Sequence, residues 1–169
     1  CRIGAAQRWW LHHSLASLSK SFGEAGASLI LRRGNCIAEL MRLATESGAV
    51  RVYANHHYEP WWREAESELG AQIELALHDG NQLAPPASLL TGGGTRYRVF
   101  TPWWKALLER MPPPRPLTAP DTIDGVAGLA SETLQDWNLL PTAPDWSGGF
   151  ADWNPGEDGA RDAFRAFLP

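Results

Sequence analysis

The sequence predicts an α/β fold, with a Rossmann-like, doubly wound parallel sheet followed by a long irregular linker. Short apolar runs alternate with amphipathic segments in the first part of the chain, glycines end those segments, and Trp, Pro and Gly dominate the last part. Strands separated by helices pair in parallel, because a crossover connection needs about a dozen residues. We therefore expect an α/β domain over residues 1–111 and a linker over residues 112–169 with one short terminal helix.

Each expected element rests on a local pattern. Apolar residues recur at three- and four-residue spacings from residue 5 to residue 22, which is typical of an amphipathic helix. Asn35 suits a helix N-cap, Gly48 suits a helix end, and Pro60 suits the first turn of a helix that ends at Gly70. The helices are expected at residues 5–22, 36–47, 60–70 and 155–168. The strands are expected in the apolar runs at residues 28–31, 50–54 and 73–77.

The second half of the chain has a different composition. The glycine triplet at residues 92–94 is expected to form a flexible turn before a strand-like aromatic segment, Tyr97–Met111. Residues 111–120 (MPPPRPLTAP) have the composition of a semi-rigid polyproline linker. Adjacent tryptophans cannot both point into one core, so we expect some indoles to pack the linker against the rest of the protein. These tryptophans are Trp103, Trp104, Trp137, Trp146 and Trp153.

Composition excludes several classes of protein. Apolar residues make up 44% and charged residues 20% of the chain, as in a globular protein, and the formal net charge of -4 argues against a duplex-binding domain. No apolar run reaches the roughly 18 residues of a membrane span, and no secretory signal pattern opens the chain, so we expect a cytoplasmic protein with no membrane partner. Cys1 and Cys36 are too few for a disulfide framework. We expect both to be reduced, and Cys36 to be a small buried residue.

Polar and aromatic residues follow two neighbouring strands of the predicted sheet. In open parallel sheets, ligands bind beyond the carboxyl ends of the strands, where the strand-to-helix loops diverge. The segments Arg32–Asn35 and Asn55–Trp62 are both loops of that kind. The pair His56–His57 beside Glu59 does not predict a metal site, because adjacent histidines point apart and no third ligand has a suitable spacing.

The motifs of the chain resemble one protein family. The segments GAAQRWWLHHSLASL, LILRRGN, ANHHYEPWWREAE, TGGGTRYRVFTPWWKALL, LLPTAPDWSGGF and WNPGEDGARDAFRAFL, in this order, resemble DNA photolyases and cryptochromes, and are most similar to bacterial cyclobutane-dimer photolyases. The resemblance covers nearly the whole chain. It implies the N-terminal α/β antenna domain of that family and the interdomain linker, without the first strand and without the helical FAD-binding domain that follows the linker in family members.

The resemblance also implies a function for the parent protein. That function is light-dependent repair of UV-damaged DNA, in which an FAD-dependent lyase splits cyclobutane pyrimidine dimers by photoinduced electron transfer. The segment itself would carry no catalytic residue and would bind little or no nucleic acid. The alternatives are a non-catalytic cryptochrome-type blue-light receptor and a stand-alone flavin- or nucleotide-binding module.

In this family the crevice beyond the strands houses a light-harvesting antenna chromophore. The resemblance implies an aromatic wall of Tyr58, Trp61 and Trp62, with Asn55 and Glu59 at the polar edges of the chromophore and Arg32 or Arg33 on a phosphate or glutamate tail. The Glu59-Pro60 step and Arg63 favour a deazaflavin or FMN over a folate. Alternatively, the two indoles fill the crevice and have a structural role. The expected cofactor-binding residues are Arg32, Arg33, Asn35, Asn55, Tyr58, Glu59, Trp61, Trp62 and Arg63.

Overall fold

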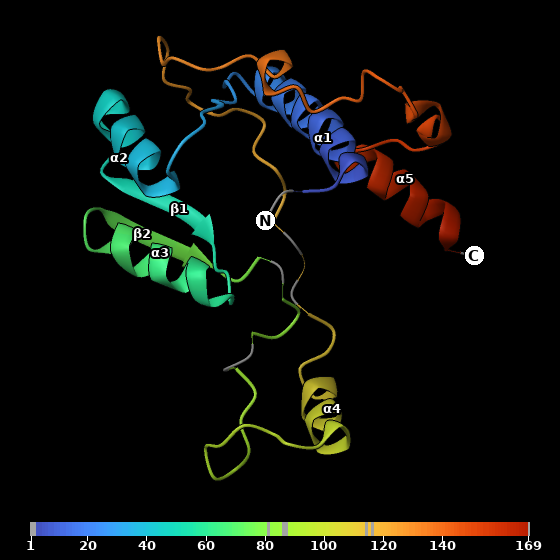
Figure 1. The fold of residues 1–169 in the computed structure, drawn as a ribbon. Helices are drawn as coiled ribbons and strands as arrows, with labels where there is room; N and C mark the ends of the chain where they lie inside the picture. The colour runs from blue at the N-terminus through green and yellow to red at the C-terminus, as the bar shows by residue number, and fades with distance from the viewer. Residues whose placement is uncertain (1–2, 81, 86–87, 114, 116, 169) are drawn as a thin grey trace. The chain divides into compact units, whose positions relative to one another are not determined.

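The computed structural model describes residues 3–80, 82–85, 88–113, 115 and 117–168, and Figure 1 shows its helices and strands. The elements are α1 (Ala5–Glu24), α2 (Cys36–Ser47), β1 (Arg51–Asn55), α3 (Pro60–Gly70), β2 (Glu74–His78), α4 (Phe100–Leu108), the 3-10 helices η1 (Gln135–Trp137) and η2 (Ser147–Phe150), and α5 (Glu157–Phe167). The chain forms two compact units. One unit combines the residues up to Glu39 with those from Pro120 onward, and the other comprises Leu40–Ala119.

A parallel pair of strands lies in the second unit. β1 and β2 pair in parallel, with Val52 opposite Leu75 and Ala54 opposite Leu77. The helix α3 connects them, so the predicted strand-helix-strand unit is confirmed, and each strand lies within one residue of its expected position. The N–H group of His56 donates to the carbonyl oxygen of His78 at 2.8 Å and extends the pairing beyond the ends of the strands.

The predicted strand at residues 28–31 is wrong, and the described sheet has two strands. The backbone around this segment forms isolated hydrogen bonds with the linker: Ile123 N–H donates to Ala25 at 2.7 Å, and Glu132 N–H donates to Leu31 at 2.8 Å. The linker is irregular there, so these bonds do not continue into a ladder. The α/β class and the parallel pairing are confirmed, whereas the larger doubly wound sheet is not present in the described residues.

Helix boundaries follow the predicted signals. The Asn35 side chain accepts a hydrogen bond from Ala38 N–H at 3.0 Å and caps α2. Gly48 adopts a φ of 72° directly after α2, a conformation that favours glycine. Pro60 begins α3, where its missing N–H group has no helical partner to lose. The predicted helices α1, α2, α3 and α5 are confirmed.

The strand-like interpretation of the aromatic segment is wrong, because Phe100–Leu108 forms α4. Pro102 lies in the first turn of this helix, where proline is tolerated. The glycine triplet before it forms the expected turn. Thr91 N–H donates to the carbonyl oxygen of Thr95 at 2.8 Å and closes that turn.

The linker folds together with α1. Trp9 stacks on Phe150 with ring centroids 4.9 Å apart, and Trp10 meets Trp153 edge-on at 5.9 Å. Figure 1 shows α5, drawn in red, beginning beside α1, drawn in blue. Linker aromatic residues therefore pack against the N-terminal part of the chain, as expected. The predicted domain boundary at residue 111 stays a prediction.

Few side chains are buried in the described part of the chain. The nonpolar side chains that are less than a tenth exposed are Trp9, Ala44, Leu69, Leu89, Leu107 and Leu139. Many large nonpolar side chains remain accessible instead, including Trp61, Phe100, Trp153, Phe164 and Phe167. The chain therefore presents much aromatic surface to solvent, which agrees with the expectation of indoles that do not fit one core.

Cys36 differs from its predicted environment. Cys36 is free and exposed, so its prediction as a buried residue is wrong. It is the first residue of α2. Cys1 lies outside the described residues. Among those residues, no helix is both long and apolar enough to cross a bilayer.

Candidate functional site: the turn beyond the two parallel strands

The turn Asn55–Pro60 leaves the carboxyl end of β1 and leads into α3. Beside it, Asp79 and Gly80 follow β2. A β-carbon built on Gly80 would lie 2.8 Å from Cγ of Asn55, so a larger residue there would displace the Asn55 amide. The two post-strand segments therefore meet at one edge of the sheet, as the parallel arrangement requires.

Tyr58 is tied to the segment after β2. Its hydroxyl donates a hydrogen bond to Oδ1 of Asp79 at 2.8 Å. This bond favours the protonated phenol, so it raises the pKa of Tyr58, with smaller contributions from burial and from the charges of Asp79 and Glu66. The phenol is therefore held as a neutral donor, and one carboxylate fixes its position.

Glu66 approaches the same turn from α3. Its Oε1 accepts a hydrogen bond from the backbone N–H of His57 at 2.8 Å. Its Oε2 lies 2.9 Å from Nδ1 of His56, within ion-pair distance but out of line for a hydrogen bond from that nitrogen. The Glu66 side chain is only 16% exposed, so its carboxylate is largely withdrawn from solvent.

The aromatic side chains of the turn pair in a different way from the predicted wall. His57 lies 5.3 Å from Trp62 with tilted rings, and the His56 ring meets Tyr58 edge-on at 4.7 Å. In the described part of the chain, no ring contact joins Tyr58 to either tryptophan. Trp61 is 63% exposed and Trp62 is 39% exposed. The two indoles therefore keep accessible faces within their unit.

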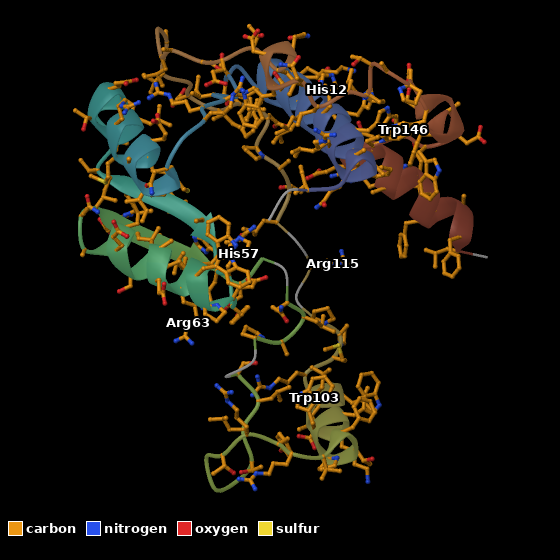
Figure 2. The ribbon with its side chains drawn as sticks, in the orientation of Figure 1. His12, His57, Arg63, Trp103, Arg115 and Trp146 are labelled. Atoms are coloured by element: carbon orange, nitrogen blue, oxygen red, sulfur yellow. The ribbon has the colours of Figure 1, made fainter. Side chains whose placement is uncertain are left out.

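The charged residues at the start of α3 point outward. Oε2 of Glu59 lies 4.0 Å from Nδ1 of His57, and both side chains are about half exposed. Arg63 is exposed, and Figure 2 shows its guanidinium extending away from the ribbon of α3. Within the described ranges, no group of three or more His, Cys, Asp or Glu side chains is arranged to hold a metal ion. The turn thus offers ring faces and carboxylates, a chemistry suited to a planar organic ligand with hydrogen-bond donors.

The second predicted loop, Arg32–Asn35, belongs to the other unit and contacts the linker. Arg32 donates to the carbonyl oxygen of Ala130 from Nε at 3.3 Å and from Nη2 at 3.1 Å. Asn35 uses its side-chain oxygen to cap α2. The predicted crevice between this loop and the turn after β1 stays a prediction.

Arg33 is more strongly engaged than its neighbours. Its Nε donates to Oε2 of Glu132 at 2.6 Å, its Nη2 donates to the carbonyl oxygen of Asp136 at 2.6 Å, and its guanidinium lies 5.8 Å from the Trp137 ring centroid. The bond from Arg33 lowers the pKa of Glu132. The structure therefore gives Arg33 a linker contact in place of a free guanidinium for a phosphate tail.

Two residues that hold the turn were missed by sequence reasoning. Asp79 and Glu66 lie 21 and 9 residues from their partners in the chain. A signal existed for Glu66, because it lies four residues after Trp62 and three before the buried Leu69, on the apolar face of α3. An acidic residue on that face requires an internal partner.

We predict that Asp79→Asn lowers the pKa of Tyr58 toward the ordinary value of 10.0. The neutral amide accepts a weaker hydrogen bond from the phenol and no longer repels a phenolate. An ultraviolet absorbance titration of tyrosinate measures the change, and Tyr58→Phe identifies which of the three tyrosines is observed. An unchanged Tyr58 titration in Asp79→Asn would show that this contact does not persist in solution.

Comparisons with known proteins extend over nearly the whole chain. A family model described as DNA photolyase matches residues 1–121. The chain is 39% identical over 178 residues to the deoxyribodipyrimidine photo-lyase of Agrobacterium fabrum (strain C58), which covers 98% of this chain and 36% of that protein. It is 29% identical over 170 residues to cryptochrome-2 of Arabidopsis thaliana, which covers 85% of this chain and 27% of that protein.

The fold is also similar to that of a solved structure. The crystal structure of a bacterial class III photolyase from Agrobacterium tumefaciens superposes with a TM-score of 0.88 at 39% identity. The superposition covers 97% of this chain and 36% of that one. The chain thus spans about a third of the length of the relatives that it matches.

Proposed function

Because the chain belongs to the DNA photolyase family, we propose that it forms the antenna-bearing N-terminal part of a light-dependent DNA repair enzyme. The observation that supports this proposal is the similarity to a class III photolyase, at 39% identity over 97% of the chain. In the intact protein, FAD would supply the electron for splitting cyclobutane pyrimidine dimers in UV-damaged DNA. In this proposal, the contribution of this chain is the collection of light.

The proposed antenna ligand is a planar chromophore, a deazaflavin or FMN in preference to a folate, bound at the turn after β1. The accessible faces of Trp61 and Trp62 support stacking of such a ring. Asn55 and Glu59 would meet polar ring edges, and Arg63 would stay available for a phosphate group. The alternative, in which the two indoles fill a crevice, gains no support from their exposure within unit Leu40–Ala119.

A fluorescence titration of the full-length protein with FMN, and with a deazaflavin, tests the antenna proposal. We expect Trp61→Ala or Trp62→Ala to weaken binding roughly fivefold to tenfold, because each substitution removes a stacking interaction that contributes about 1 kcal/mol to the binding free energy. Trp153→Ala is the matched control, since Trp153 is as exposed as Trp61 but lies in the linker. An absence of saturable binding to the unsubstituted protein, or an equal loss in Trp153→Ala, would contradict the proposal.

A cryptochrome-type receptor is the second candidate, and it is supported by the 29% identity to cryptochrome-2. The higher identity to a photo-lyase favours repair. A repair enzyme and a cryptochrome-type receptor would both bind a flavin, so flavin absorbance does not distinguish the two candidates. Light-dependent cleavage of a cyclobutane pyrimidine dimer does distinguish them, because only the repair enzyme is expected to perform it.

A further inference from the structure

The turn after β1 is held by a carboxylate that lies outside it. The Oε1 atom of Glu66 accepts the His57 N–H hydrogen bond at 2.8 Å, and its Oε2 atom lies 2.9 Å from Nδ1 of His56. The Glu66 side chain is 16% exposed and the His56 side chain is 29% exposed. Glu66 therefore contacts two consecutive residues of the turn from the second half of α3.

Glu66 differs from the other acidic residues of its helix. Glu64 and Glu68 are exposed, as is usual for charged residues on a helix surface. Glu66 instead shares a face with the buried Leu69, and withdrawing a carboxylate from water is unfavourable unless it gains hydrogen bonds. The turn supplies that hydrogen bond, so the position of Glu66 and the conformation of the turn depend on each other.

The His57 N–H group lies between two regular elements. β1 ends at Asn55 and α3 begins at Pro60, so neither the strand pairing nor the helix includes His57. A backbone donor in such a segment needs an acceptor, and the Glu66 carboxylate provides one. This backbone is the anchor of the His57 side chain, whose ring lies 5.3 Å from the Trp62 ring.

We propose that Glu66 is a positioning residue for the antenna ligand, and this inference rests on the proposed function. It sets the backbone of His57, and through the His57 ring it sets the orientation of the Trp62 face on which the chromophore stacks. Glu66 does not touch the ligand, because Oε1 is bonded inside the turn and Oε2 faces His56. The Tyr58 bond to Asp79 ties the same turn to the segment after β2.

The test compares Glu66→Ala, Glu66→Gln and the control Glu64→Gln in the full-length protein. Hydrogen exchange measured by mass spectrometry on peptides spanning residues 55–60 reports the His57 N–H group, and an FMN titration reports the site. We expect Glu66→Ala to accelerate exchange there and to weaken FMN binding, each roughly tenfold, the factor for losing one hydrogen bond to a charged group. Glu66→Gln keeps a neutral acceptor and is expected to restore part of both effects.

Unchanged exchange in Glu66→Ala would overturn the proposal, as would an equal loss of FMN affinity in Glu64→Gln. Thermal unfolding separates positioning from general destabilisation, because Glu66→Gln is expected to unfold near the temperature of the unsubstituted protein while still binding FMN more weakly. If the unsubstituted protein binds neither FMN nor a deazaflavin, the antenna proposal fails and the positioning role falls with it. The exchange measurement then decides separately whether Glu66 holds the turn.

Discussion

Replacing Gly159 by alanine is expected to lower the free energy of unfolding by about 3 kcal/mol, through overpacking against a rigid backbone. Gly159 lies in the first turn of α5 and is buried. An added β-carbon would overlap the carbonyl oxygen of Asn154 and would lie 2.7 Å from its carbonyl carbon. Backbone atoms cannot rotate away as a long side chain can, so the start of α5 must separate from the preceding segment.

The matched control for this substitution is Gly23→Ala in α1. A β-carbon on Gly23 meets nothing within 4 Å. Alanine favours the helix there, so this variant is expected to be neutral or stabilised by up to about 1 kcal/mol. Denaturant unfolding measures both variants, and hydrogen exchange in α5 shows whether that helix detaches. Equal stability of Gly159→Ala and the unsubstituted protein would contradict the close approach to Asn154.

The second large effect is expected at Leu107, the most buried side chain of α4. It is 3% exposed, and truncation to alanine removes buried methyl groups and leaves a cavity. Such a substitution costs about 2 to 5 kcal/mol in a well-packed site. We expect a fall in the denaturant midpoint with little change in the slope of the transition, because the same surface is exposed on unfolding.

Leu108→Ala is the control for Leu107→Ala. Leu108 is the next residue in the same helix and is 48% exposed. Because much of this side chain already contacts water, we expect a loss below about 1 kcal/mol. A similar loss from both substitutions would show that α4 does not bury the face that contains Leu107.

The parts of the fold that the sequence predicts have short-range signals. Pro60 and Gly70 bound α3, and the apolar runs on either side of it form β1 and β2. Asn35 caps α2 with its own side chain, three residues from the N–H group that it bonds. All of these interactions connect residues that are close in sequence, and local pattern therefore finds them.

The parts that the sequence did not predict depend on distant partners. The run at residues 28–31 has strand composition, yet a strand exists only where a neighbour completes the ladder, and its neighbour here is the irregular linker at Ser131 and Glu132. The aromatic content of Phe100–Leu108 favours a strand, and the structure places a helix there. β-propensity is a weak guide where side-chain packing decides.

In the candidate site, too, local features were predicted from the sequence and contacts between distant residues were not. The segment Asn55–Trp62 was predicted to bind a ligand because, in open parallel sheets, ligands bind beyond the carboxyl ends of the strands. The carboxylates that hold it, Glu66 and Asp79, come from α3 and from the segment after β2, so spacing in the sequence does not connect them to the turn. The family resemblance implied that Arg33 binds a phosphate or glutamate tail, whereas its contact with Glu132 joins residues 99 positions apart, which sequence spacing does not reveal.

Light-dependent repair by the full-length, FAD-containing protein is the most direct test of the proposed function. The substrate is an oligonucleotide with one cyclobutane pyrimidine dimer, incubated with the protein under blue light and, in parallel, in the dark. We predict that the intact pyrimidines are restored only in the light. A flavin-loaded protein that absorbs blue light but leaves the dimer intact would contradict the repair function and favour a cryptochrome-type receptor.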